Sequence, residues 1–167
     1  RLSLVGSEMC KETAIKAAKR AGADAIKLQT YTADTITLDC KSEDFKIKQG
    51  TIWDGGYLYD LYKRAYTPWE WHEELFHVAR EEGLVCFSSP FDKTAVDFLE
   101  GLNNPIYKIA SFEITDIPLI EYAARTMKPI VISTGIAMQE DIQLAVETCR
   151  AAVSYTHLRA HETKANL

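Results

Sequence analysis

The sequence has no run of about 18 apolar residues, which is the length that a membrane-spanning helix requires. Its first six residues are too short in their apolar part to act as a signal peptide, so the sequence predicts a cytoplasmic protein. Only 8 glycines and 5 prolines occur among 167 residues, which excludes a collagen-like or low-complexity chain. The hydrophobic content of 47% indicates a globular domain that can bury a core without disulfides or structural metal.

Closely spaced cysteines and a basic stripe are also missing. Cys10, Cys40, Cys86 and Cys149 lie far apart, which argues against a zinc site or a disulfide scaffold and predicts free, mostly buried thiols. The 19 Lys+Arg against 24 Asp+Glu give a formal net charge of -5. Because nucleic-acid binding needs clustered positive charge, we expect neither nucleic acid nor membrane as a partner.

Residues 153–167 look foreign to the rest of the sequence. Read back through the genetic code, residues 153–163 resemble a translated sequencing adapter. We therefore predict a domain over residues 1–152 and a non-native tail over residues 153–167. Without the tail, 17 basic and 23 acidic residues leave a net charge of -6. The two remaining histidines, His72 and His77, lie about 140° apart around a predicted helix, which disfavours a histidine metal site.

Short apolar runs alternate with amphipathic helical patterns. The runs at residues 23–28, 84–88, 105–110 and 129–133 are nearly continuous in apolar character, which predicts parallel strands covered on both faces. One helix is predicted over residues 68–82, with a capping box at its start and Gly83 at its end. Asp92 is expected to cap the next helix, and Thr115 or Asp116 the one after it.

The spacing of the predicted strands indicates the fold class. Successive strands begin 22 and 24 residues apart, at Leu84, Ile106 and Ile130, which is the length of a βα unit. Such units build either an open doubly wound sheet or a (β/α)8 TIM barrel, which needs roughly 250 residues. The sequence supplies about four units, so we predict an α/β fold that is a partial TIM barrel. Residues 31–66 are too many for an ordinary βα loop, which predicts a functional loop over the strand ends.

Polar residues follow the predicted strands at their carboxyl ends, where α/β folds bind ligands. They are Lys27, Gln29, Ser89, Lys108, Ser111, Glu113 and Ser133. Two lysines and several hydroxyls on one rim predict a phosphate or carboxylate site, and a glutamate beside them can orient a reacting group or move a proton. An unpaired lysine in an apolar strand is costly, which favours functional lysines. Serines at strand ends equally often make turn hydrogen bonds, so their roles stay open.

Other conspicuous residues have simpler interpretations. His72 is expected to face solvent on its helix. Trp69 and Trp71 are expected to pack against the core, and Cys86 is expected to lie within it.

Four motifs resemble the sialic acid synthase family in order and spacing. They are AGADAIKLQT at 21–30, SSPFD at 88–92, YKIASFEI at 107–114 and STG at 133–135. Two aromatic segments, YLYDLY at 57–62 and YTPWEWH at 66–72, look like the pseudaminic acid synthase branch of that family, as does Phe112 in place of its usual glycine. The resemblance covers residues 11–152.

The resemblance implies substrates and roles. The family condenses phosphoenolpyruvate with an N-acyl amino sugar, here 2,4-diacetamido-2,4,6-trideoxy-altrose, to a nine-carbon 2-keto acid. The matching residues that would bind the phosphate and carboxylate of phosphoenolpyruvate are Lys27, Ser89, Lys108, Ser111 and Ser133, with Gln29 in the same motif. Glu113 matches the family's glutamate beside the reacting carbons, and Lys108 would act with it in catalysis. Trp53, Tyr57 and Tyr59 would form an aromatic lid over the sugar.

The resemblance is incomplete at both ends. The family's first-strand motif is not present, so Glu8 is not equated with the catalytic glutamate of that motif. The family's later strands, which supply a histidine pair for a divalent metal (Mn or Mg), and its C-terminal antifreeze-like domain have no match here. We therefore expect a truncated sequence whose whole protein holds the metal, with a homodimer as a further option.

Three alternatives stay open at this point. The branch could instead be that of the N-acetylneuraminate or legionaminate synthases. A second hypothesis, from a different functional class, is that the chain is a non-catalytic α/β binding module. A third is that the chain alone has no function, because half a barrel leaves strand edges and apolar faces uncovered.

Overall fold

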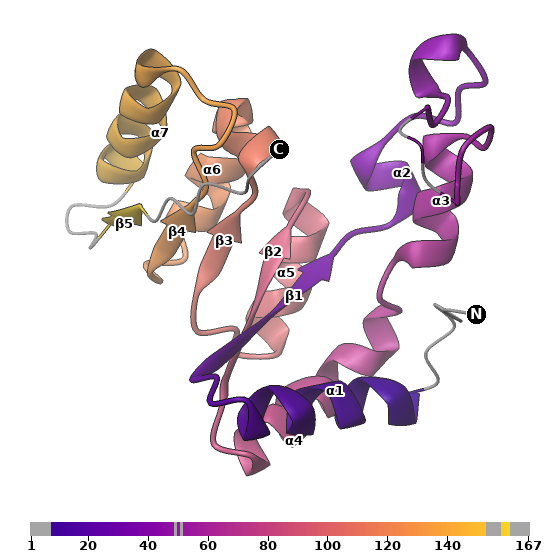
Figure 1. Cartoon of the computed structure of the whole chain (residues 1–167). Coiled ribbons are helices and arrows are strands. Elements are labelled where there is room, and N and C mark those ends of the chain that lie inside the picture. The colour runs from indigo at the N-terminus through magenta and orange to yellow at the C-terminus, as the bar shows by residue number, and fades with distance from the viewer. Residues whose placement is uncertain (1–7, 49, 51, 153–157, 161–167) are drawn as a thin grey trace.

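The computed structural model describes residues 8–48, 50, 52–152 and 158–160. At its centre is a sheet of parallel strands in the order β1-β2-β3-β4-β5 (Figure 1). The strands are β1 Ala25–Thr30, β2 Val85–Pro90, β3 Tyr107–Ile109, β4 Ile130–Ile132 and β5 Leu158–Ala160. Their order in the sheet equals their order in the chain, which is the arrangement of a barrel wall and lacks the reversal of a doubly wound sheet. The α/β prediction is confirmed.

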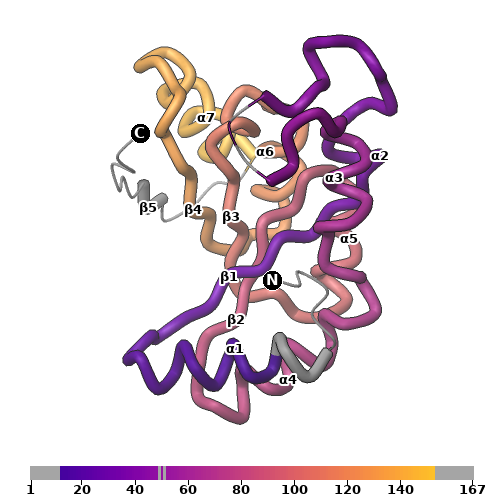
Figure 2. The backbone as a smooth tube through the Cα atoms, turned by 45° about the vertical axis from the view of Figure 1, so that its right-hand side comes forward, coloured from indigo at the N-terminus to yellow at the C-terminus, as the bar shows by residue number. Residues whose placement is uncertain are grey.

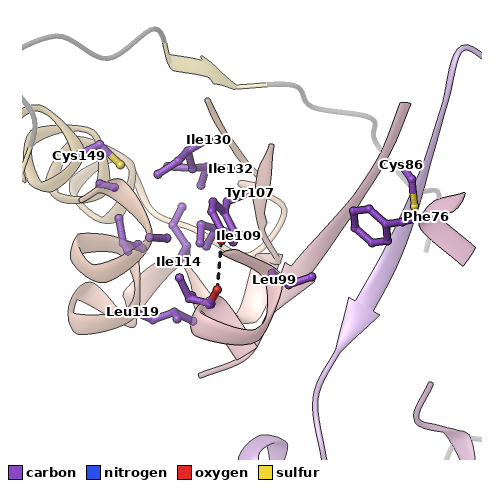
Figure 3. Packing of buried hydrophobic residues seen from close by; sticks show 14 of the residues in the cluster. Phe76, Cys86, Leu99, Tyr107, Ile109, Ile114, Leu119, Ile130, Ile132 and Cys149 are labelled. Atoms are coloured by element: carbon purple, nitrogen blue, oxygen red, sulfur yellow. Dashed lines mark hydrogen bonds between the residues drawn. The ribbon is translucent and has the colours of Figure 1, made fainter. Parts of the chain in front are cut away.

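Helices and short 3-10 turns connect the strands. The helices are α1 Glu8–Arg20, α2 Ala33–Ile36, α3 Leu58–Ala65, α4 His72–Glu81, α5 Lys93–Gly101, α6 Ile117–Ala124 and α7 Gln139–Ala152, and the turns are η1 Glu43–Phe45, η2 Trp69–Trp71 and η3 Ser111–Thr115. The core lies between the sheet and its covering helices α1, α4, α5, α6 and α7. Figure 3 shows Tyr107 and Ile109 of β3 and Ile130 of β4 packed with Leu119 and Cys149 of these helices. Burying each such side chain stabilises the fold by about 1.5–3 kcal/mol.

The opposite face of the sheet is open, contrary to the expectation that both faces are covered. Ala25, Lys27 and Gln29 alternate along β1 with residues that face the helices, and all three are exposed. Val85 on the next strand is 45% exposed. In a closed barrel this face lines the interior, so what covers it there is the rest of the barrel wall rather than helices. We call it the open face.

Aspartate side chains cap the starts of two helices, as the sequence predicts. Asp92 caps α5 by accepting hydrogen bonds from the backbone N–H groups of Thr94 and Ala95. Asp116, rather than Thr115, caps α6.

The helix predicted over residues 68–82 begins differently from expectation. Pro68 has an extended ψ of 133°, the turn η2 follows it, and α4 starts only at His72, without the predicted capping box. Its end is as predicted, because Gly83 takes a positive φ of 67°, which a residue with a Cβ rarely adopts.

Residues 31–66 form an excursion between β1 and α4 that carries α2, η1 and α3. Figures 1 and 2 show α2 and α3 beyond the carboxyl end of β1. An isolated antiparallel bridge joins Lys46 to Tyr57 inside the excursion. The predicted long loop therefore has its own secondary structure, and we call it the 31–66 segment.

Only part of the predicted tail is described. Its residues 158–160 form β5 beside β4, and the others lie outside the described residues, so the foreign origin of the tail stays a prediction. Across the part of the chain that the structure describes, no helix combines the length and apolar character needed to cross a membrane.

Candidate active site

The strand register brings the predicted polar residues onto one face. Gln29 lies opposite Ser89 in the β1–β2 ladder. Ser88 pairs with Tyr107, so the residues that follow them, Ser89 and Lys108, share the opposite side of the sheet. Since alternate residues of a strand share a face, Lys27 lies on this open face as well. Two lysines, an amide and a hydroxyl thus converge near the carboxyl ends of three neighbouring strands.

The electrostatics of this cluster are dominated by its two lysines. The pKa of Lys108 is lowered to about 8, first by burial and then by the positive charge of Lys27, against the opposing charge of Glu113. Desolvation also lowers the pKa of Lys27. Two ammonium groups that repel each other in a partly desolvated site favour the binding of an anion between them, because its negative charge offsets both positive charges.

Neutral oxygen atoms hold the ammonium group of Lys108. Its Nζ donates to the hydroxyl of Ser133 and, at 2.7 Å, to the carbonyl oxygen of Ile109. These acceptors fix the position of the charge without neutralising it. Ser133 therefore contacts the predicted catalytic lysine and does not merely close a turn.

Two buried polar atoms make no hydrogen bond within the described chain. They are Oγ of Ser89 and Oε2 of Glu113. Leaving a buried polar group unsatisfied costs about 1–3 kcal/mol, a cost that polar atoms of a ligand can offset. Burial is the largest cause that raises the pKa of Glu113, and Asp116 raises it further. Glu113 is therefore suited to hold and release a proton at Oε2.

Ser111 joins the two loops beside this cluster. Its Oγ accepts a hydrogen bond of 3.2 Å from the backbone N–H of Ile136, which ties η3 to the loop after β4. A Cβ at Gly135 would lie 3.2 Å from the same oxygen. Glycine is what allows this close approach, so Ser111 has a structural contact in addition to its predicted role.

The three aromatic residues predicted to lie over the sugar, Trp53, Tyr57 and Tyr59, are all in the 31–66 segment. The hydroxyl of Tyr59 donates to Asp34 at 2.8 Å. The guanidinium of Arg64 lies 5.3 Å from the ring centroid of Trp53. Both contacts are internal to the segment and neither involves a residue of the lysine cluster, so the role of these rings in binding stays a prediction.

The expectation for His72 is wrong, because this side chain is completely buried. Helical spacing could have revealed it, since position 72 precedes Leu75 and Phe76 by three and four residues on the apolar side of α4. The expectations for Trp69 and Cys86 are confirmed. Trp69 stacks on Phe98 at 4.8 Å between ring centroids, and burial raises the pKa of Cys86 to about 12.

The described residues do not fit a divalent metal. Nowhere in the ranges that the structure describes do three or more His, Cys, Asp or Glu side chains gather as a metal-binding group. The lysine cluster instead repels cations. We therefore assign no metal-dependent step to this chain's residues.

Comparison with known proteins gives a family match and close relatives. A family model described as the NeuB family matches residues 14–164. The pseudaminic acid synthase of Helicobacter pylori is 54% identical over 142 residues, which are 85% of this chain and 41% of that protein. That of Campylobacter jejuni serotype O:2 is 53% identical over 128 residues, which are 77% of this chain and 37% of that protein. The N,N'-diacetyllegionaminic acid synthase of Legionella pneumophila is 32% identical over 143 residues, which are 86% of this chain and 40% of that protein.

Solved structures agree on the fold. The N-acetylneuraminic acid synthetase of Leptospira borgpetersenii superposes with a TM-score of 0.75 at 24% identity, over 92% of this chain and 48% of that one. The spore coat polysaccharide biosynthesis protein SpsE of Bacillus subtilis superposes with a TM-score of 0.70 at 28% identity, over 94% of this chain and 40% of that one. The chain thus spans about two fifths of the length of the relatives it matches in sequence.

Proposed function

Because the chain belongs to the NeuB family, we propose that the whole protein condenses phosphoenolpyruvate with 2,4-diacetamido-2,4,6-trideoxy-altrose to pseudaminic acid. Identity above one half to two pseudaminic acid synthases, against 32% to a legionaminic acid synthase, supports this branch. A bond forms between C3 of phosphoenolpyruvate and the aldehyde carbon of the open-chain sugar, whose oxygen takes up a proton. Water adds at C2, and the resulting tetrahedral intermediate expels phosphate and leaves the 2-keto acid.

In this proposal the lysine cluster binds phosphoenolpyruvate. Lys27 and Lys108 offset the negative charge of its phosphate and carboxylate, and this matters most as phosphate leaves. The unsatisfied hydroxyl of Ser89 donates to one of these anionic groups. Ser133 keeps Lys108 in place, and Gln29 can donate from the neighbouring position on β1.

Glu113 acts on protons beside the reacting carbons. Its Oε2 is buried and its pKa is raised, so this oxygen can take the proton that water loses on adding to C2. The nearby charge of Lys108 stabilises the carboxylate before that transfer. The sugar would contact Trp53 and Tyr59, whose rings suit its methyl and acetamido groups.

One observation carries the proposal, namely two lysines on one face beside two unsatisfied polar atoms. Titration calorimetry of phosphoenolpyruvate into the 167-residue chain tests it. We expect Lys27→Met to weaken binding by about 10- to 100-fold, since charge-assisted hydrogen bonds contribute about 1.5–3 kcal/mol. Lys16→Met is the matched control, because Lys16 is an exposed lysine on α1, across the sheet from the site. Equal affinities of the two variants would refute the assignment.

The sugar is tested with the whole protein. Phosphate release from phosphoenolpyruvate should be faster with the diacetamido sugar than with N-acetylmannosamine, and the opposite preference would remove the protein from this branch. A homodimer and a cytoplasmic location are also proposals for the whole protein, and sedimentation velocity and cell fractionation check them.

A further inference from the structure

The two ends of the 31–66 segment meet at one buried side chain. The segment leaves β1 after Thr30 and returns to α4 through Pro68. Nε2 of His72 lies 2.9 Å from the hydroxyl of Thr30, and Nδ1 lies 3.2 Å from the carbonyl oxygen of Pro68. Thr30 and His72 are both fully buried. A single imidazole therefore bridges the start and the end of this segment.

If the ring of His72 is neutral, only one arrangement of donors and acceptors satisfies this bridge. The carbonyl oxygen of Pro68 only accepts, so Nδ1 of His72 carries the proton and donates. Nε2 then accepts, and the hydroxyl of Thr30 donates to it. Because Thr30 has a single hydroxyl proton, Ser88 must donate to Thr30 across 2.7 Å. Full burial favours this neutral form over a charged imidazole.

A second set of contacts joins the same two ends. The indole Nε1 of Trp69 donates to the carbonyl oxygen of Tyr31 at 3.3 Å. The ring of Trp69 stacks on Phe98 of α5, and His72 meets the same ring edge-on with 5.4 Å between centroids. The start of the segment, its end and a third helix are thus packed at one point.

We infer that His72 is a positioning residue that clamps the base of the 31–66 segment at the rim of the site. The segment carries Trp53 and Tyr59, so the clamp sets where these rings stand relative to the strand ends. The link to the sugar rests on the proposed function, whereas the clamp itself is a property of the chain.

Hydrogen exchange of the 167-residue chain tests the clamp directly. Thr30→Val keeps the shape of residue 30 and removes its donor, whereas Thr30→Ser keeps the donor and is the matched control. With Thr30→Val, amides of the 31–66 segment should exchange at least about tenfold faster while those of α6 and β4 keep their rates. His72→Asn, whose amide can still donate to Pro68, should show a smaller effect than His72→Leu. Equal acceleration throughout the molecule, or none, would overturn the inference.

Nitrogen NMR of the imidazole gives a readout that mere packing does not move. We expect Nδ1 of His72 to be protonated and Nε2 to be free. The other tautomer would contradict the clamp, because Nδ1 would then have no proton to donate to the carbonyl oxygen of Pro68. In the whole protein, Thr30→Val should raise the KM for the sugar about tenfold and leave the affinity for phosphoenolpyruvate within about twofold. If the wild type binds no phosphoenolpyruvate, the proposed function fails while the exchange result still decides the clamp.

Discussion

Lys108 donates a hydrogen bond through Nζ to the hydroxyl of Ser133, which holds an ammonium group at the end of β3 against the end of β4. The same nitrogen donates to the carbonyl oxygen of Ile109. An ammonium group has three N–H donors, so one is left for an anion. The position of this charge is therefore set before any ligand arrives, which lowers the entropy cost of binding.

The affinity of the chain for phosphoenolpyruvate should fall as the pH rises through about 8, because the pKa of Lys108 is lowered to about 8. Below this pH Lys108 is charged and attracts the anion, and above it the amine is neutral. Binding near this pH should take up protons, which calorimetry in buffers of different ionisation enthalpy measures. Lys108→Arg keeps its charge, so an unchanged pH profile in this variant would assign the effect to another group.

The same lowered pKa predicts a pH dependence of stability. Between the value of about 8 in the folded chain and the ordinary 10.5, the unfolded state binds more protons at this residue. The contribution of Lys108 to the free energy of unfolding should therefore increase with pH across that window. Urea denaturation at pH 8 and at pH 10 measures how the free energy of unfolding changes with pH, both for the chain and for Lys108→Met. An equal change in the two proteins would show that Lys108 is not desolvated in the folded state.

Glu113→Gln should stabilise the chain at neutral pH while it abolishes activity of the whole protein. Burial raises the pKa of Glu113, so the folded state binds more protons than the unfolded state between the ordinary and the raised value, and stability falls with rising pH there. The amide cannot ionise and so removes this loss, and urea denaturation at pH 7 should show a higher free energy of unfolding for the variant. A variant that loses stability at pH 7 would show that the carboxylate is well solvated.

Gly135→Ala should weaken binding of phosphoenolpyruvate, because the new Cβ would lie 3.2 Å from Oγ of Ser111 and push apart the two loops that this hydroxyl joins. The double variant with Ser111→Ala relieves the contact, so a double-mutant cycle should show coupling of at least about 0.5 kcal/mol. Gly101→Ala is the control, since a Cβ there meets nothing within 4 Å and should stabilise α5 by up to about 1 kcal/mol. If the effects of Gly135→Ala and Ser111→Ala on the binding free energy were strictly additive, the two residues would not be coupled and the prediction would be wrong.

Trp53→Ala should raise the KM of the whole protein for the sugar by at least about tenfold, as expected when an aromatic contact of about 1.5–3 kcal/mol is lost. Its affinity for phosphoenolpyruvate should be unchanged, because that anion binds at the lysine cluster. Steady-state kinetics with each substrate varied in turn separates these effects. An equal loss for both substrates would place Trp53 in folding rather than in sugar binding.

The features that the sequence predicts well depend on neighbours along the chain. The strand positions follow from continuous apolar runs, the cap at Asp92 from its own carboxylate, and the end of α4 from the positive φ of Gly83. The sequence predicts functional roles for Lys27 and Lys108, because an unpaired lysine inside an apolar strand is costly. Each of these features is set by residues that are close together in the sequence.

Other features depend on residues far apart in the sequence. The partners of His72 are Thr30, 42 residues earlier, and Phe98, on another helix, so they could not be derived even though helical spacing places His72 on the apolar side of α4. Coverage of the sheet depends on how many strands are present, which no local pattern reports. The orientation of Trp53 follows from how the 31–66 segment folds on itself, and its distance from the lysine cluster could not be derived from composition.

The strand order also bears on how the chain folds. Ala25 pairs with Val85 across 60 residues, whereas Ser88 pairs with Tyr107 across 19. Closing the longer loop costs about 1 kcal/mol more in chain entropy, so the pairing of β2 with β3 should form early and β1 should dock late. Mutations in β1 should then speed unfolding and leave the refolding rate nearly unchanged. Lys27 would join Lys108 only in this last step, so the anion site would be the final part of the sheet to assemble.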